Sequence, residues 1–498
     1  MAVVIAIDAG TTGVRSVAVH EDGSVVGSAY RELPQHFPAP GLVEHDPDDI
    51  WAAAAETLAA LAARLDGEAV AAIGIANQRE TAVVWDRRTG RPRHRALVWQ
   101  DRRTARRCRE LVGAGHLDLV RRTTGLVLDP YFSATKLEWL LAEGGVAADS
   151  ALAFGTVDTW LLWNLTGGID GGVHATEASN ASRTLLLDIH DLSWSADLVD
   201  LFGVPASCLP EVRPSAGRFG TTAPGTPLPG VPVTGVLGDQ QAALLGQACV
   251  RPGMTKATYG TGSFVLMNVG GTCPAPVEGL LGTVAWTGLG TGPTYALEGA
   301  IFVTGALVQW LRDGLGIIPD SAAMGPLAAS VPDSGGVAFV PALTGLGSPW
   351  WDPDARGTVV GITRGTTAAH LARAGLEAMA FQTRDVADAM TSAAGRPVAE
   401  LRVDGGASAM DLLVQVQADQ LGVPVARSGQ HEATALGAAA LAGLAAGVWS
   451  SPDEVAARWR PDLRCRPLAP RSEADAHHRR WRAAVDRARG WAAGQPTP

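Results

Sequence analysis

Short apolar runs separated by polar turns open this chain of 498 residues. The apolar residues 3–7 end at Asp8, a turn of glycine and threonine follows, and residues 14–19 form a second apolar run. Residues 25–30 form a third run. Runs of this length that are bounded by glycine are typical of strands joined by tight turns. The pattern therefore predicts a meander of three strands at the start of the chain.

Helical and strand patterns then alternate. Asp46 followed by Pro47 predicts a helix start, and an alanine- and leucine-rich run continues to residue 65. Residues 70–75 and 81–85 are apolar runs of strand length. Helices and strands in this alternation are typical of an α/β protein.

Three later stretches complete the pattern. Residues 233–246 predict a strand, an acidic turn and a helix, in which Asp239 is placed to cap the helix. Residues 433–448 are mostly alanine, glycine and leucine; they are too few to span a membrane and are interpreted as a closely packed internal helix. His477 and His478 lie in a charged C-terminal stretch and are interpreted as a solvated helical face, not as metal ligands.

The opening hairpin has a counterpart in the second half of the chain. Residues 254–267 again contain an apolar run, a glycine–threonine turn and another apolar run, and a third glycine-rich turn follows residues 401–403. Glycine lets backbone N–H groups approach phosphate oxygens closely. The two hairpins therefore predict a duplicated chain in which each half contributes one phosphate loop to a central cleft.

Composition narrows the class of partner. Hydrophobic residues make up 47% of the chain and charged residues 18%, which is typical of a globular protein, and the net charge is −10. A net negative charge argues against nucleic acid and anionic membranes as partners. The five cysteines are scattered without C-x-x-C spacing, so neither disulfides nor a zinc site is expected. Together with a start that shows no targeting segment, this predicts a cytoplasmic protein.

The first hairpin carries the chemistry of a phosphate site. Thr11 and Thr12 add hydroxyl donors, Arg15 adds a fixed positive charge, and Asp8 at the strand end is placed to hold Mg²⁺ directly or through water. An ordinary tight hairpin is the alternative. The two lysines, Lys136 and Lys256, do not lie in a P-loop motif, so any phosphate cradle here is independent of lysine.

Four further residues could serve an acceptor site. Arg79 and Glu80 at a strand exit offer a donor and an acceptor for a small polyol, although a solvated loop pair is the simpler interpretation. Trp99 could form a ligand wall or belong to the core. Asp239 could be a plain helix cap or accept the proton of a substrate hydroxyl.

These residues together resemble the FGGY carbohydrate kinases of the actin/hexokinase-like superfamily, and within them the glycerol kinases. The resemblance runs from about residue 6 to residue 481. The residues that carry it are 8–15, 77–81, 125–133, 155–160, 238–244, 258–262 and 345–353. The pairing of Asn77-Gln78-Arg79-Glu80 with the stretch from Asp129 to Ser133 is specific to the glycerol kinases within the family.

The resemblance implies roles for individual residues. Those implied to bind the glycerol hydroxyls are Arg79, Glu80, Tyr131, Asp239 and Gln240, with Trp99 and Phe264 as walls. Those implied to meet the phosphates or the nucleotide are Thr11, Thr12, Gly13, Arg15, Thr261, Gly305, Gln309 and Gly406. Asp239 would act as general base, and ATP and Mg²⁺ would be the cosubstrate and metal.

The chain departs from relatives at two places. Met410 stands where many relatives have an asparagine near the adenine, and a thioether cannot hydrogen-bond as an amide does. We therefore expect weaker nucleotide discrimination. The loop at residues 220–230 has no basic residue, whereas some bacterial glycerol kinases use an arginine there to bind fructose 1,6-bisphosphate. Little inhibition by that anion is expected.

The resemblance also implies the fold. It predicts two actin-like (ribonuclease H-like) domains with central mixed sheets flanked by helices, residues 1–246 and 247–498, and an active site in the cleft between them. A homodimer or homotetramer is implied by family habit. Two alternatives stay open: a kinase of the same family acting on a ketopentose such as xylulose, and an actin- or chaperone-like nucleotide switch.

Overall fold

The computed structural model describes residues 2–65, 67–290, 292–430 and 432–493. Its N-terminal half is built on a six-stranded mixed sheet with the order β13-β14-β5-β1-β2-β3. These strands are β1 (Val3–Ala9), β2 (Gly13–His20), β3 (Val25–Glu32), β5 (Val70–Asn77), β13 (Ala216–Thr221) and β14 (Pro232–Gly238). β1, β2 and β3 form the antiparallel meander that the sequence predicts, and β5 and β14 add to it in parallel.

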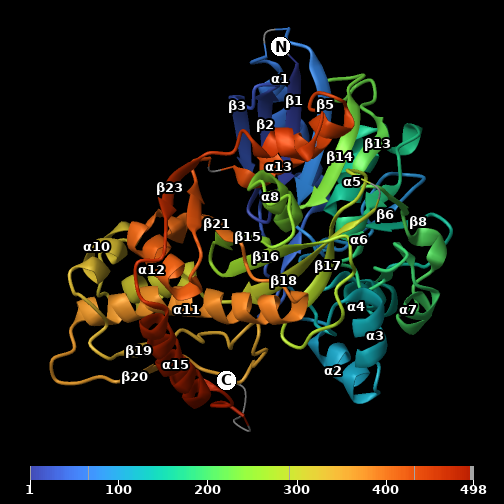
Figure 1. Ribbon diagram of the computed structural model, residues 1–498. Coiled ribbons are helices and arrows are strands. Elements are labelled where there is room, and N and C mark those ends of the chain that lie inside the picture. Colours follow the sequence, from blue (N-terminus) through green and yellow to red (C-terminus); the bar gives the residue numbers. More distant parts are fainter. Residues whose placement is uncertain (1, 66, 291, 431, 494–498) are drawn as a thin grey trace.

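The C-terminal half repeats this topology in a seven-stranded sheet, β17-β18-β16-β15-β21-β22-β23. Its strands are β15 (Met254–Tyr259), β16 (Ser263–Gly270), β17 (Leu281–Trp286), β18 (Thr294–Ile301), β21 (Glu400–Asp404), β22 (Val425–Ser428) and β23 (Pro461–Cys465). β15, β16 and β18 are antiparallel, and β21 and β22 follow in parallel, as β5 and β14 do in the first sheet. The predicted duplication is therefore visible in the strand order of both halves (Figure 1).

Helices cover both sheets. The longer ones are α1 (Pro47–Ala62), α2 (Ala105–Gly113), α3 (Leu117–Thr124), α4 (Ser133–Ala142), α5 (Val157–Leu165), α8 (Asp239–Gly246), α11 (Ala368–Ala394), α12 (Asp411–Leu421), α13 (Ala433–Ala445) and α15 (Arg471–Ala488). The shorter ones are α6 (Ala178–Ala181), α7 (Ala196–Leu201), α9 (Gly305–Gln309), α10 (Met324–Ala329) and α14 (Pro452–Ala456). Asp46 caps α1 as predicted, through a 3.0 Å bond from the Asp48 amide, but the helix ends at Ala62 and not at residue 65.

Short strand pairs lie outside the two sheets. They are β4 (Glu44–His45) with β7 (Ala96–Leu97), β6 (Val83–Asp86) with β8 (Leu152–Gly155), β9 (Ala175–Glu177) with β12 (Glu211–Arg213), β10 (Leu187–Asp188) with β11 (Ser193–Trp194), and β19 (Ala338–Val340) with β20 (Thr358–Val360). β6 begins two residues later than the predicted strand at 81–85, and Ala82 instead forms an isolated bridge with Leu97.

Two helices, α8 and α13, pack against each other at the junction of the two halves. α13 belongs to the C-terminal half, yet it packs against β1, β5 and β14 of the N-terminal sheet, and Figure 1 shows it, in orange-red, among the blue strands. α8 of the N-terminal half packs against α13 and against β16. A Cβ atom on Gly437 of α13 would lie 1.8 Å from the carbonyl oxygen of Ala242 in α8. The predicted closely packed internal helix is thus confirmed, and glycine is what allows the two backbones to touch.

A hydrophobic cluster joins the halves around these helices. It includes Val4 of β1, Leu244 of α8, Leu266 of β16 and Ala439 of α13, all at most 1% exposed. Separate clusters lie under each sheet. The residues that end β14 and begin α8 therefore sit on a well-packed base at the junction of the two halves.

The prediction of a solvated face at His477 and His478 is wrong for His478. His478 is 6% exposed, and its Nε2 lies 2.7 Å from Asp385 Oδ1, while Trp481 Nε1 donates to Asp385 Oδ2 at 2.8 Å. Ala474, His478, Trp481 and Val485 recur at helical spacing, so they share the face of α15 that meets the core. The surrounding charges concealed this periodicity.

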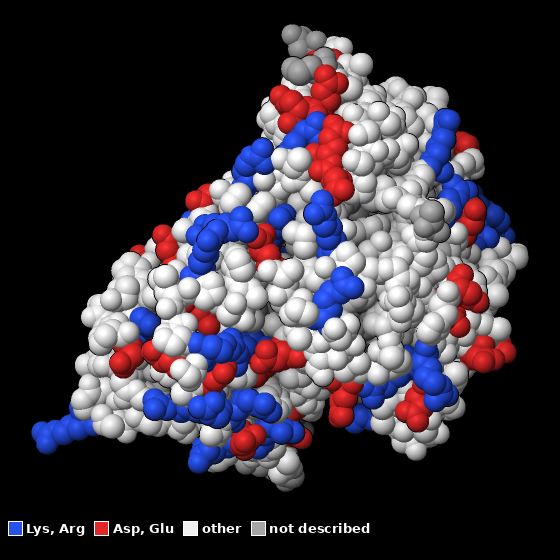
Figure 2. Space-filling view, viewed as in Figure 1, with Lys and Arg blue, Asp and Glu red and all other residues white. Residues whose placement is uncertain are grey.

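The surface carries both signs of charge. Figure 2 shows acidic and basic side chains interspersed on one face, among wider areas of uncharged residues. All five cysteines are free thiols. Among the helices that the structure describes, none combines the length and apolar character needed to cross a lipid bilayer.

Candidate active site

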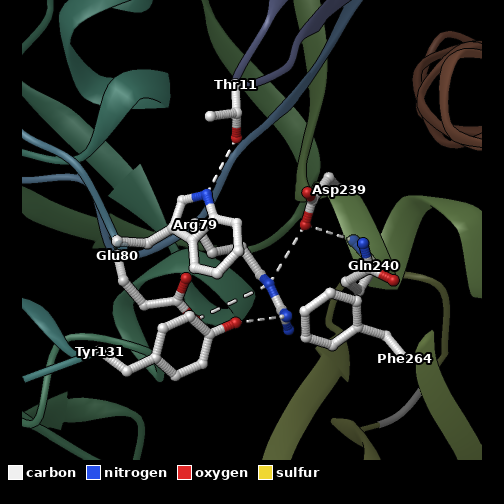
Figure 3. Close-up of a pocket in the computed structure, with 8 residues that line it drawn as sticks. Thr11, Arg79, Glu80, Tyr131, Asp239, Gln240 and Phe264 are labelled. Atoms are coloured by element: carbon white, nitrogen blue, oxygen red, sulfur yellow. Dashed lines mark hydrogen bonds and ion pairs between the residues drawn. The ribbon is translucent and has the colours of Figure 1, made fainter. Parts of the chain in front are cut away.

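A small pocket lies where the two halves meet. Its cavity measures about 40 Å³. The residues that line it are Thr11, Arg79, Glu80, Trp99, Tyr131, Asp239, Gln240 and Phe264. Phe264 comes from β16 in the C-terminal sheet and the others come from the N-terminal half (Figure 3). Every residue that the resemblance implied for the acceptor therefore lines one pocket.

Asp239 faces Arg79 across this pocket. β14 runs without a loop into α8, so Asp239 is the first residue of the helix and Gly238 occupies the cap position. The predicted capping role is thus one residue out of place, because the strand ends only at Gly238. The Oδ1 atom of Asp239 accepts a hydrogen bond from the backbone N–H of Gln240 at 2.7 Å and lies 3.2 Å from Arg79 Nε. Its carboxylate is 27% exposed, and so it is open to a ligand.

Arg79 and Glu80 are buried at 2% and 1% exposure, which excludes the solvated loop pair. Arg79 Nη2 donates to Tyr131 Oη at 3.3 Å, so this guanidinium connects two other pocket residues. Glu80 has a φ of 61°, in the left-handed region that residues other than glycine rarely adopt. Burial raises the pKa of Glu80, and the charges of Arg79 and Arg183 oppose that shift. The pocket therefore offers charged donors and acceptors in a space with little water.

Aromatic rings form the walls. The Trp99 ring lies edge-on to Tyr131 at 5.6 Å and to Phe264 at 6.4 Å between centroids. Trp99 Nε1 donates to Thr11 Oγ1 at 2.9 Å, which ties this wall to the first hairpin. Trp99 is thus a wall residue and not a core residue.

The first hairpin brings its charged groups together behind the pocket. Asp8 and Arg15 are opposite each other in the β1–β2 register, and Arg15 pairs with Glu432, which precedes α13. Burial raises the pKa of Asp8 to about 7, and the negative charges of Asp239 and Glu432 add to this shift. The positive charge of Arg15 opposes it. Within the described residues, the lining of the pocket includes Thr11 but not Asp8, Thr12, Gly13 or Arg15.

A second and larger cavity of about 720 Å³ lies in the C-terminal half. Thr261, Gly305, Gln309, Gly406 and Met410 line it, so the five residues of the C-terminal half that the resemblance implied for the nucleotide meet there. They come from the β15–β16 turn, from α9, and from the turn before α12. Its size fits a nucleoside better than the first pocket does.

Three buried residues next to the pocket were missed at the level of sequence. Arg183 and Glu298 contact Glu80 and Arg79, and Lys256 Nζ donates to Gln240 Oε1 and, at 3.1 Å, to Thr258 Oγ1. Burial lowers the pKa of Lys256 to about 8, although the negative charges of Asp404 and Asp239 act to raise it. A single charge inside the otherwise uncharged runs 295–301 and 254–259 is the signal that could have identified Glu298 and Lys256.

The two halves repeat one sheet topology, with a small polar pocket between them and a larger cavity in the C-terminal half, and family comparison identifies the class of protein. The N-terminal domain of the FGGY family of carbohydrate kinases matches residues 3–246, and its C-terminal domain matches residues 255–446. The chain belongs to the FGGY family of carbohydrate kinases.

Individual relatives are more specific. A glycerol kinase of Trichlorobacter lovleyi is 53% identical over 498 residues, covering 99% of this chain and 100% of that protein. The crystal structure of Plasmodium falciparum glycerol kinase with ADP is 33% identical with a TM-score of 0.93, covering 98% of each chain. A xylulose kinase from Rhodospirillum rubrum, with a TM-score of 0.87, 24% identity and coverage of 97% and 98%, shares the fold.

Proposed function

We propose that the protein transfers the γ-phosphoryl group of ATP to the 3-hydroxyl of glycerol, giving sn-glycerol 3-phosphate and ADP. The observation that carries this proposal is the small pocket in which Arg79, Glu80 and Tyr131 surround the open carboxylate of Asp239. A three-carbon polyol offers little apolar area, so selectivity depends on hydrogen bonds whose buried partners a wrong substrate would leave unpaired. The similarity to glycerol kinases over the full chain supports the same acceptor.

Each group then has one task. Arg79, Glu80, Tyr131 and Gln240 bind the hydroxyls, and Trp99 and Phe264 hold the carbon skeleton. Asp239 orients the reacting hydroxyl and takes its proton late, because a loose phosphoryl-transfer transition state needs mainly alignment and charge neutralisation. Thr11, Thr12, Gly13 and Arg15 meet the phosphates, and the residues of the larger cavity hold the nucleoside. Two domains, residues 1–246 and 247–498, enclose the reacting atoms and exclude water.

Mg²⁺ fits at Asp8. Burial raises the pKa of this carboxylate, and the like charges of Asp239 and Glu432 add to the shift, which is the setting in which a divalent cation is stabilising. One or two carboxylates with substrate phosphates are a usual Mg²⁺ environment. When bound, the ion neutralises charge on the phosphates. The free thiols fit a cytoplasmic enzyme, and the homodimer or homotetramer stays a prediction.

A coupled assay of ADP formation tests the proposal. The purified protein is given ATP and Mg²⁺ with glycerol, with xylulose, or with no acceptor. We expect rapid ADP formation with glycerol alone. Faster turnover of xylulose would identify a ketopentose kinase, and ADP formation without any acceptor would identify a nucleotide switch.

Replacing Asp8 with asparagine should weaken metal use. We expect kcat/KM for MgATP to fall roughly 10–100-fold, as when a group that orients a metal is lost. In the wild type, Asp8 takes up a proton as the pH falls below about 7. This proton competes with Mg²⁺ for the carboxylate, so the Mg²⁺ concentration for half-maximal rate should rise at acid pH. That pH dependence should disappear in Asp8→Asn, as Mg²⁺ titrations at pH 6 and pH 8 would reveal. A variant with an unchanged Mg²⁺ titration would rule Asp8 out.

Met410 should limit nucleotide selectivity. It lines the nucleoside cavity without an amide, so Met410→Asn is expected to strengthen the preference for ATP over GTP by about 1 kcal/mol, roughly fivefold in kcat/KM. Met410→Leu is the matched control, since it keeps an apolar side chain and should leave the ratio unchanged. A wild-type preference as sharp as that of relatives with asparagine would contradict the prediction.

A further inference from the structure

Two buried side chains next to the pocket hold Arg79 and Glu80, two of the three charged residues that line it. Arg183 follows α6 in the N-terminal half, and Glu298 lies on β18 in the C-terminal sheet; both are 0% exposed. Arg183 Nε donates to Glu80 Oε1 at 2.7 Å, and its Nη2 donates to Glu298 Oε1 at 2.8 Å. The other oxygen of Glu298 accepts from Arg79 Nη1 at 2.5 Å.

These contacts close a ring of alternating charge. Arg79 Nε lies 3.9 Å from Glu80 Oε1. The ion pairs therefore form a closed ring of four residues, in the order Arg79, Glu80, Arg183, Glu298. Two guanidinium groups balance two carboxylates. Burial raises the pKa of Glu298, but the charges of Arg183 and Arg79 outweigh it and hold that pKa at about 2. Removing one member leaves the others with an uncompensated buried charge, which is costly.

The ring fixes the direction of both pocket residues. Arg183 engages one carboxylate oxygen of Glu80, and Ser133 Oγ donates to the Glu80 carbonyl at 2.9 Å, which holds the left-handed backbone at this residue. Glu298 holds one nitrogen of Arg79, while the other two nitrogens face Asp239 and Tyr131. The Arg183 guanidinium also lies over the Tyr131 ring, 5.6 Å from its centroid.

We propose that Arg183 and Glu298 are positioning residues for acceptor selectivity, aiming Glu80 and Arg79 at the hydroxyls of the polyol. This inference rests on the proposed function. Because Glu298 is the only ring member from the C-terminal sheet, the acceptor site is complete only when the two halves meet at this point. Phosphoryl transfer and acceptor recognition thereby depend on the same contact between the halves.

Steady-state kinetics of Arg183→Met and Glu298→Gln test this role. We expect KM for glycerol to rise roughly 10–100-fold, because charge-assisted bonds orient the binding groups. KM for ATP should stay within about twofold, since the nucleoside cavity is separate. The preference for glycerol over propane-1,2-diol, which lacks one hydroxyl, should shrink roughly tenfold. Arg183→Lys should keep only part of the wild-type affinity and selectivity for glycerol, because an ammonium group lacks the planar fork with which arginine spans two carboxylates.

A double-mutant cycle with Glu80→Gln separates positioning from general destabilisation. If Arg183 acts through Glu80, adding Arg183→Met to Glu80→Gln should raise KM for glycerol little further. Arg384→Met is the matched control: Arg384 is also buried, and it pairs with Asp475 on the far side of the C-terminal half. This control should lower the melting temperature without changing KM for glycerol.

Opposite results would overturn the inference. If the effects of Arg183→Met and Glu80→Gln on KM for glycerol multiply independently, the ring is purely structural. The same holds if Arg183→Met lowers only the melting temperature and leaves KM and selectivity unchanged. If Arg183→Met does not fold, Glu298→Gln and Arg183→Lys give the same comparison. A wild type that does not phosphorylate glycerol would instead contradict the proposed function, so the two failures are distinguishable.

Discussion

Replacing Asp239 with asparagine is expected to lower kcat roughly 10²–10⁴-fold while leaving ATP binding nearly intact. Asparagine keeps the shape of the side chain and can still lie against Arg79 and the Gln240 amide, but it cannot accept the hydroxyl proton. Asp239 is not part of the lining of the nucleoside cavity in the described chain. Single-turnover kinetics with excess enzyme would measure the loss, and equilibrium dialysis would measure the dissociation constant of ATP.

Asp313→Asn serves as the control for this experiment. Asp313 is 63% exposed, pairs with Arg312 and lies outside both cavities, so its replacement should change neither quantity. Should Asp239→Asn also abolish ATP binding, Asp239 would have to be regarded as structural.

The second large effect is expected at the contact between α8 and α13. Gly437→Ala would place a Cβ atom 1.8 Å from the Ala242 carbonyl oxygen and 2.9 Å from the Gly246 amide nitrogen. Both are backbone atoms, so α8 and α13 must move apart. We expect the free energy of unfolding to fall by roughly 3 kcal/mol or more, and kcat to fall with it because α8 begins at Asp239.

A second glycine offers a matched control. Gly113 in α2 has nothing within 4 Å of its Cβ position, so Gly113→Ala should leave the protein as stable or about 0.5–1 kcal/mol more stable. Thermal unfolding of both variants, followed by circular dichroism, measures the difference. Equal melting temperatures for Gly437→Ala and the wild type would mean that the helices are packed less closely than described.

The part of the regular structure that could be predicted follows from local chemistry. The meander at β1–β3 and the start of α1 at Pro47 are visible as apolar periodicity and a capping aspartate. Boundaries were less predictable: β14 continues to Gly238, so Asp239 entered the helix and did not cap it. His478 was misjudged since its partner, Asp385, lies 93 residues away in the chain.

The candidate site divides in the same way. The residues that line the pocket were all expected, on the strength of the motifs that resemble the FGGY kinases. The ring behind the pocket was not, because Arg79 and Glu298 are 219 residues apart and no motif joins them. The signals that existed, such as a single glutamate in an apolar strand, indicate that a partner must exist but not which one.

What the sequence by itself determined is the opening meander, several further strands and helices, and the family to which the motifs point, because these depend on side chains close together along the chain. Only the tertiary structure decided that α13 crosses to the other sheet, that Glu298 reaches Arg79, and that Arg79 is buried and not solvated. The reason is physical: burial and the pairing of buried charges depend on which surfaces meet in space, and surfaces far apart in the chain meet only when the two sheets pack together.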